Sequence, residues 1–213
     1  MVIVLLVSIS LGSVAIPIDE IIAILLGNNS SKSSWSTIIL HFRLPKAITA
    51  MLVGSGLSIA GLLMQTLFKN PLAGPFVLGI SSGASLGVAI LILGAGIFGG
   101  VLTTVSFSSW GLAIASSLGA AIVLLAVLLT AHKVRNTMNI LIIGLMFGTV
   151  TSAIISVFTF FSDAEKIQQF VFWGFGNLGN LSWNEILVFF YYLCYSYYQF
   201  NTYYKTTKFI VNW

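Results

Sequence analysis

Long apolar runs without any charge constrain this chain more than any other feature. Residues 47–68, 110–131 and 138–161 contain no Asp, Glu, Lys or Arg. A helix of about 20 such residues crosses the hydrocarbon core of a bilayer. Over the whole chain only 7% of residues are charged, against about 25% in soluble domains. A water-soluble fold is excluded, because so few charges cannot cover its surface.

The apolar runs together predict an all-α, polytopic transmembrane bundle of about six spans. They are 1–16, 47–68, 81–100, 110–131, 138–161 and a last run that starts near Trp183. Residues 1–16 can also be the core of a signal peptide, but a basic start is missing, which favours a membrane helix. The polar segment 19–35 follows, and 21–26 within it can lie flat on the membrane surface. Residues 162–182 are predicted as a polar loop.

The basic residues lie between the apolar runs, where they flank a membrane. The net charge of +4 and the pI near 9.3 therefore do not indicate a nucleic-acid partner. With a cytoplasmic start, the inner side holds Lys69, Lys133, Arg135, Lys205 and Lys208, and the outer side holds Lys32, Arg43, Lys46 and Lys166. This distribution favours the orientation only slightly. A single cysteine, Cys194, excludes an internal disulfide and a cysteine-based metal cluster.

Small residues recur at a spacing of four. The pairs are Gly83 with Gly87, Gly96 with Gly100, and Gly144 with Gly148. In lipid this spacing lets helix backbones approach closely. We interpret the pairs as packing contacts within the bundle.

Two motifs resemble catalytic signatures only in part. Residues 79–83 fit the GxSxG pattern around Ser81, which requires a preceding strand and a nearby base. The predicted topology places His41 and His132 on opposite sides of the membrane, so a membrane-embedded serine hydrolase is the lesser alternative. Residues 27–33 (GNNSSKS) lack the glycine before the lysine that a phosphate loop needs. We therefore expect no ATP site, no cofactor and no metal in this chain.

The stretch Lys69-Asn70-Pro71-Leu72-Ala73-Gly74-Pro75 must interrupt the helical path. Two prolines four residues apart forbid a continuous helix. Broken backbone at membrane depth persists only where it is buried in protein or lines a cavity. The stretch is therefore either an ordinary cytoplasmic turn or a broken segment beside a transport path.

The motifs also carry a resemblance to a known family. RLPK at 43–46, the stretch VGSGLSIAGLLMQTLFKNPLAGPFVLGISSGASLG at 53–87, and FWG at 172–174 resemble FecCD-type permease subunits. These belong to importers of iron–siderophores, haem and vitamin B12. The resemblance implies a ten-helix permease in a bacterial plasma membrane that is not itself an enzyme. It also implies four kinds of partner: a second permease subunit (homo- or heterodimer), cytoplasmic ATPase subunits, an extracytoplasmic substrate-binding protein and the lipid bilayer.

The same resemblance assigns roles to individual residues. Arg43 and Lys46 match outward basic positions that meet carboxylates of the binding protein. Asn70, Pro71 and Leu72 match a turn that narrows the path on the cytoplasmic side, and Thr137 matches its counterpart constriction. Met138, beside Thr137, departs from the small polar residue expected there.

The last part of the chain differs in composition from the rest. All seven tyrosines lie between Tyr191 and Tyr204, and no glycine follows Gly179. Either the last helix is an unusually aromatic one, or the reading frame is lost near Phe189. We favour the second interpretation, and expect 1–188 to be a partial permease domain and 189–213 to be an aromatic-rich tail that is out of frame. The family's LG-x-x-x-A-x-x-LG coupling segment is not found. An inactive, truncated permease remnant is therefore the alternative to a working permease.

Overall fold

The computed structural model describes residues 2–12, 14–27, 32–76, 78–94, 108–132, 137–179 and 181–211, and within these ranges the regular elements are all helical. The elements, in chain order, are α1 (Val2–Ser10), α2 (Ile18–Leu25), α3 (Ser33–Ile38), the π-helical turn η1 (Ile39–Arg43), α4 (Leu44–Phe68), α5 (Ile80–Ile92), α8 (Ser109–Ala131), α9 (Thr137–Phe160), α10 (Ala164–Gly174) and α11 (Trp183–Val211). The predicted all-α class is confirmed. Each of the six apolar runs contributes one of these helices.

The chain forms two compact units. The terminal unit comprises Met1–Ser58 and Asn177–Trp213, and the central unit comprises Ile59–Gly176. Helix α4 contributes its first part to the terminal unit and its second part to the central unit. Each unit is described by itself below.

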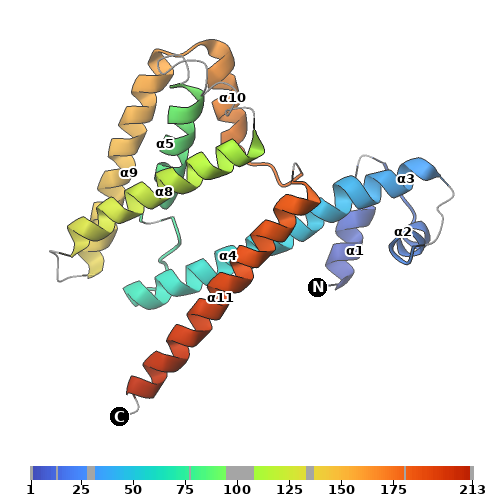
Figure 1. Cartoon of the computed structure of the whole chain (residues 1–213), viewed down its shortest axis with the longest axis horizontal. Coiled ribbons are helices and arrows are strands. Elements are labelled where there is room, and N and C mark those ends of the chain that lie inside the picture. The colour runs from blue at the N-terminus through green and yellow to red at the C-terminus, as the bar shows by residue number, and fades with distance from the viewer. Residues whose placement is uncertain are drawn as a thin grey trace. The chain divides into compact units, whose positions relative to one another are not determined.

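The central unit is built around α5. This helix packs against both α8 and α9, and α10 covers its far end (Figure 1). One cluster of buried side chains joins the end of α4, the segment before α5, and α8: Phe68, Ala73, Leu78, Val123 and Val127. Partly buried side chains of α5 and α9, among them Ile80 and Ile140, pack against it. A second cluster, of Val88, Ala89, Ile92 and Leu93, lies at the other end of α5.

Small residues bring α5 and α8 together. A Cβ atom placed on Gly83 would lie 2.7 Å from the carbonyl oxygen of Gly119, and one on Gly87 would overlap the carbonyl oxygen of Ala115. Backbones this close leave no room for a larger side chain. The contact is of the kind that small residues at a spacing of four allow in lipid.

The start of α5 also lies close to α9. Gly79, which precedes α5, has a φ of +72°, a conformation that costs glycine little. A Cβ atom at Gly79 would lie 2.9 Å from the carbonyl oxygen of Gly144, and one at Gly148 would lie 3.3 Å from Ser82 Oγ. Gly96 and Gly100, the remaining predicted pair, lie outside the described residues.

Helix α10 corrects one expectation. The segment 162–182, expected to be a polar loop, contains a helix at 164–174 that begins after Asp163. Its apolar side chains Ile167, Phe170 and Trp173 pack against the α5 cluster at Val88–Leu93. Their spacing of three residues places them on one helix face. Burial of this face against α5 stabilises a helix in a segment that is otherwise polar.

The terminal unit holds its own small core. Ile9 of α1, Ile16 in the connection before α2, Ile21 and Ile24 of α2, and Ile39 of η1 are buried together. Helix α2 is apolar on both sides, since Ile21 and Ile24 are buried while Ile18, Ile22 and Leu25 are exposed. Gly56 of α4 lies beside Leu193 of α11, because a Cβ atom there would meet Leu193 Cδ1 at 3.4 Å.

The π-helical turn in front of α4 has a chemical cause. Helical structure runs from Ser33 to Phe68, and Pro45 interrupts its hydrogen bonding because proline has no backbone N–H. In an α-helix the proline ring also clashes with the carbonyl four residues earlier, which here belongs to His41. The wider turn at Ile39–Arg43 relieves that clash and sets the direction of Arg43.

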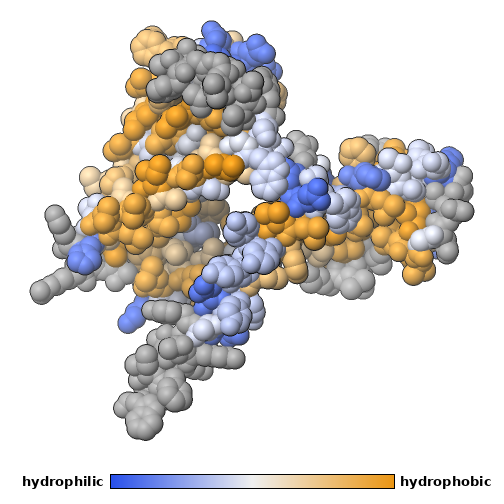
Figure 2. Space-filling view, viewed as in Figure 1, coloured by the Kyte–Doolittle hydropathy of each residue, from blue (hydrophilic) through white to orange (hydrophobic). Residues whose placement is uncertain are grey.

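Three stretches are long and apolar enough to cross a membrane: Ser33–Phe68, Ser109–Ala131 and Asn139–Phe160, among the described residues. Apolar side chains make up much of the face of the molecule that Figure 2 shows. On α8 the exposed apolar side chains include Ile114, Leu118, Ile122, Leu125 and Leu129. Their spacing of three to four residues forms a continuous stripe along the helix. The chain is therefore a multi-pass membrane protein.

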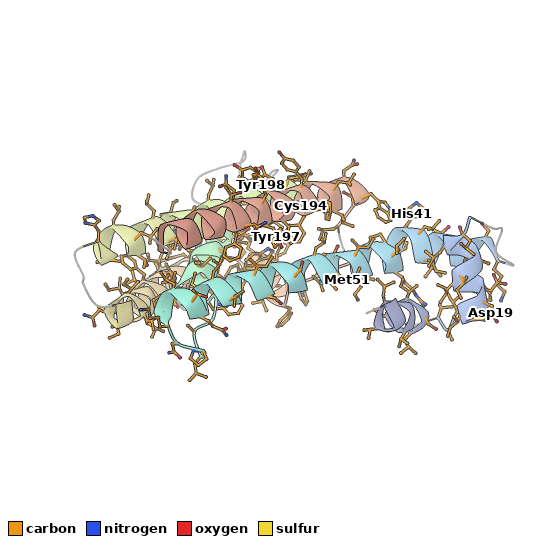
Figure 3. The ribbon with its side chains drawn as sticks, turned by 90° about the horizontal axis from the view of Figure 1, so that it is seen from below. Asp19, His41, Met51, Cys194, Tyr197 and Tyr198 are labelled. Carbon is orange, nitrogen blue, oxygen red and sulfur yellow. The ribbon has the colours of Figure 1, made fainter. Side chains whose placement is uncertain are left out.

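Helix α11 continues through the position where the composition changes. It runs unbroken from Trp183 to Val211. Cys194, Tyr197 and Tyr198 lie along it (Figure 3), and all three are exposed. A helical tail is compatible with either reading frame, so the frame change after residue 188 stays a prediction.

Candidate translocation turn and docking residues

Helix α4 ends in a tightly bonded turn. Lys69 follows the helix with a φ of +48° and is the one residue other than glycine with a positive φ in the described part of the chain. The N–H of Asn70 donates to the carbonyl of Gln65 at 3.2 Å, and the N–H of Lys69 donates to the carbonyl of Thr66 at 3.4 Å. This pair of bonds is the Schellman arrangement, which satisfies carbonyls that a helix end leaves without partners.

The side chains of the turn add two further bonds. Asn70 Oδ1 accepts the N–H of Leu72 at 2.9 Å, and Gln65 Nε2 donates to the carbonyl of Pro71 at 3.0 Å. The predicted break is confirmed, because α4 ends at Phe68 and α5 begins at Ile80. The broken segment is thus a defined turn with its polar groups bonded locally.

The turn presents one apolar side chain and buries the next. Leu72 is 89% exposed, whereas Ala73 is 5% exposed. Ala73 belongs to the cluster that includes Val127, near the end of α8, and Ile140, near the start of α9. The turn therefore lies toward the end of the central unit where α8 ends and α9 begins.

Thr137 is the first residue of α9, and its side chain lies outside the described set. The structure thus brings Asn70, Pro71, Leu72 and the backbone of Thr137 toward one end of the central unit. The packing residues Gly83, Gly87, Gly144 and Gly148 lie along α5 and α9 in the same unit.

Arg43 makes contacts that its place in the sequence does not reveal. Its Nη1 donates to the carbonyls of Ile9 at 2.7 Å and Ser10 at 3.1 Å, and Nη2 donates to the carbonyl of Val14. Ile9 and Ser10 are the last residues of α1. A cation at a helix C-terminus also interacts favourably with the helix dipole. Arg43 therefore caps α1 and ties it to η1.

Lys46 differs from Arg43 in its surroundings. It is exposed in the first turn of α4. Both side chains line one groove of about 680 Å³, together with Leu11, Phe42 and Leu178. Gly12 lies where a Cβ atom would come within 2.6 Å of Arg43 Nη2, so glycine makes room for the guanidinium.

Ser81 does not have the surroundings of a nucleophile elbow. It lies in the first turn of α5, and residues 78–79 before it form a bend and a left-handed cap instead of a strand. Groups of three or more His, Cys, Asp or Glu residues that could hold a metal are not found among the described residues. The strand that a nucleophile elbow requires is thus not present at residues 78–79, before Ser81.

Two residues have structural roles that the sequence motifs do not assign. Gln65 enters the motifs only as part of the stretch at the end of the helix, and Gly12 belongs to none of them. A polar side chain six residues before a helix-breaking proline was the available signal for Gln65. Nothing near Gly12 in the sequence indicates the approach of Arg43, because that contact joins segments about 30 residues apart.

Comparisons with known proteins agree with the motifs. The model of the FecCD transport family matches residues 1–208. The vitamin B12 import system permease protein BtuC of Escherichia coli is 33% identical over 73% of this chain and 47% of its own length. The "Probable iron chelatin transport system permease protein" of Helicobacter pylori is 38% identical over 76% of this chain and 46% of its own length.

A solved structure is also similar. It shows an inward-facing conformation of a protein assigned as a metal-chelate type ABC transporter, with a TM-score of 0.73 and 27% identity. The match covers 91% of this chain and 56% of that one. The chain spans about half the length of the curated relatives that it matches. With a family model that covers nearly all of its residues, the chain belongs to the FecCD transport family.

Proposed function

We propose that this chain forms part of the permease of an ATP-driven importer of an iron(III)–siderophore or a related metal chelate. The observation that carries the proposal is membership of the FecCD family, with relatives named for vitamin B12 import and iron chelatin transport. The chain lies in the cell membrane of a bacterium as a multi-pass protein. Its partners in transport are a second permease subunit, cytoplasmic ATPase subunits and an extracytoplasmic binding protein.

The turn at Asn70–Leu72 narrows the transport path on the cytoplasmic side, together with the start of α9 at Thr137. The exposure of Leu72 supports this role, since an apolar side chain at the tip of a fixed turn can obstruct a pore. The local hydrogen bonds of the turn also support it, because backbone that lines a path must satisfy its polar groups within the protein.

Lys46 takes part in docking of the binding protein. Opposite charges across such an interface guide orientation and speed encounter. Arg43 contributes to the same surface chiefly by holding α1 in place, because its guanidinium already donates to three carbonyls. ATP hydrolysis takes place in the separate ATPase subunits.

Uptake by the assembled importer tests the proposal. Proteoliposomes that contain this permease with its ATPase and binding protein receive a radiolabelled ferric siderophore, haem or cobalamin. The proposal predicts ATP-dependent accumulation of the ferric siderophore. Haem and cobalamin are the alternative substrates with which its accumulation is compared. ATP-independent accumulation, or accumulation of none of the three, contradicts it. The second outcome would favour an inactive remnant.

A further inference from the structure

Gln65 contacts the turn at Asn70–Leu72 twice, once through its backbone and once through its side chain. Its carbonyl accepts the N–H of Asn70 at 3.2 Å, and its Nε2 donates to the carbonyl of Pro71 at 3.0 Å. The first bond needs only a backbone and would form with any residue at this position. The second needs a side-chain donor of this length, so it depends on the identity of residue 65.

The bond to Pro71 fixes the part of the turn that the Schellman arrangement leaves free. The backbone bonds hold Lys69 and Asn70 against α4. From Pro71 onward the chain leaves the helix, and the next buried residue is Ala73. Between these two points the side chains of Gln65 and Asn70 bond the carbonyl of Pro71 and the N–H of Leu72. The N–H of Ala73 also donates to the carbonyl of Asn70 at 3.1 Å. The two side-chain bonds and this backbone bond together set the position of the exposed Leu72.

We propose that Gln65 is a positioning residue that holds the Asn70–Leu72 turn and thereby sets the opening of the transport path at its cytoplasmic end. The inference rests on the proposed permease function. Gln65 touches no substrate in this role and acts through Pro71 and Leu72. Losing its side-chain donor frees the turn without unfolding α4, because the backbone bond from Asn70 to residue 65 remains.

A spin label at residue 72 tests the bond directly. The label is attached to Leu72→Cys in a Cys194→Ser background, which removes the natural thiol, and the full chain is placed in nanodiscs. Gln65→Leu removes the donor. One hydrogen bond of this kind corresponds to about a two- to tenfold change in an equilibrium, so the mobile fraction of the label should rise by about that factor.

Gln65→Glu adds a pH readout that a purely structural defect would not give. A protonated carboxyl donates to the carbonyl of Pro71 and an ionised one does not. Its ordinary pKa of about 4.3 is the reference, and Lys69 is the one other ionisable residue in the segment 65–75. The label should be mobile near neutral pH and become ordered on acidification, whereas the Gln65→Leu label should be mobile at both pH values.

Thr66→Val is the matched control. The Thr66 hydroxyl donates to the carbonyl of Leu62 within α4 at 2.7 Å, so this variant loses a hydroxyl next to Gln65 without touching the turn. The label should stay as ordered as in the unsubstituted chain. Equal mobility in the Thr66 and Gln65 variants, or a Gln65→Glu label that ignores pH, overturns the proposal.

Uptake measurements separate this inference from the proposed function. In the assembled importer, Gln65→Leu should change the maximal rate of ATP-driven uptake more than the concentration at half-saturation, because the binding protein captures the substrate elsewhere. A mobile label with an unchanged maximal rate overturns the role of Gln65 in setting the path. Failure of the unsubstituted importer to take up any chelate contradicts the permease function itself, while the label experiment still reports on the bond.

Discussion

The guanidinium of Arg43 donates a hydrogen bond of 2.7 Å to the backbone carbonyl of Ile9, 34 positions earlier in the chain. This bond joins the C-terminus of α1 to the π-helical turn that precedes α4. A basic residue that resembles a docking contact is therefore also an internal cap. The two roles predict different effects of substitution.

Arg43→Ala should loosen α1 at its C-terminal end. Hydrogen bonds to a charged donor each contribute about 1.5–3 kcal/mol, so local opening should become easier by about that amount. Amide hydrogen exchange of residues 5–12 should accelerate by about tenfold or more. Arg43→Lys retains the charge but loses the planar fork, and it should give an intermediate rate. Lys46→Ala, at the neighbouring exposed cation, should leave the exchange unchanged.

A double-mutant cycle with Gly12 checks that the cap is the cause. Gly12→Ala places a Cβ atom 2.6 Å from Arg43 Nη2, so the guanidinium must move. In the Arg43→Ala background the added methyl group meets no guanidinium and should have almost no effect. Additive effects of the two substitutions would show that Gly12 and Arg43 act independently, against the contact described here.

The close packing of α5 and α8 predicts opposite effects for two glycine substitutions. Gly87→Ala should destabilise the central unit, because its Cβ atom would overlap the backbone carbonyl of Ala115. Gly61→Ala, in α4, has nothing within 4 Å of its Cβ atom, and alanine is favoured over glycine in a helix by about 1 kcal/mol. Thermal unfolding in detergent should show a lower midpoint for Gly87→Ala alone. Equal unfolding midpoints for Gly87→Ala and Gly61→Ala would contradict the close contact between Gly87 and Ala115.

The positive φ of Lys69 predicts that glycine can replace it without loss of stability. A φ of +48° is strained for a residue with a Cβ atom and free of strain for glycine. Lys69→Gly should therefore leave the unfolding midpoint unchanged or raise it slightly, while the β-branched variant Lys69→Val should lower it. A lower midpoint for Lys69→Gly than for Lys69→Val would contradict the left-handed conformation.

The sequence predicted most of the helices because their signals are local. Uncharged runs mark α4, α8 and α9, and Pro71 with Pro75 marks the interruption before α5. Helix α10 was missed because the charged residues Asp163, Glu165 and Lys166 at its start mark the segment as a polar loop. Burial of its apolar face depends on where α5 ends in space, which no local pattern states.

The contacts of the candidate site residues could not be predicted from the sequence, and their roles in transport stay predictions. The resemblance to the family identified Asn70, Leu72 and Arg43 by their motifs. The bond of Gln65 to Pro71 depends on the geometry of the helix end, and the cap formed by Arg43 depends on a fold that returns α1 to η1. Both arise from three-dimensional arrangement, so composition and spacing alone do not reveal them.

The central claim is that the turn at Asn70–Leu72 borders the transport path at its cytoplasmic end. Modification of a single cysteine tests it most directly, with Leu72→Cys in the Cys194→Ser background of the assembled importer and Leu62→Cys, at an exposed position within α4, as the control. An impermeant thiol reagent should react with the Leu72→Cys thiol from the cytoplasmic face and should stop ATP-driven chelate uptake in proportion to its labelling. Any labelling of the Leu62→Cys control should leave uptake unchanged. Full labelling of the Leu72→Cys variant with unchanged uptake, or its labelling from the outer face alone, would contradict the claim.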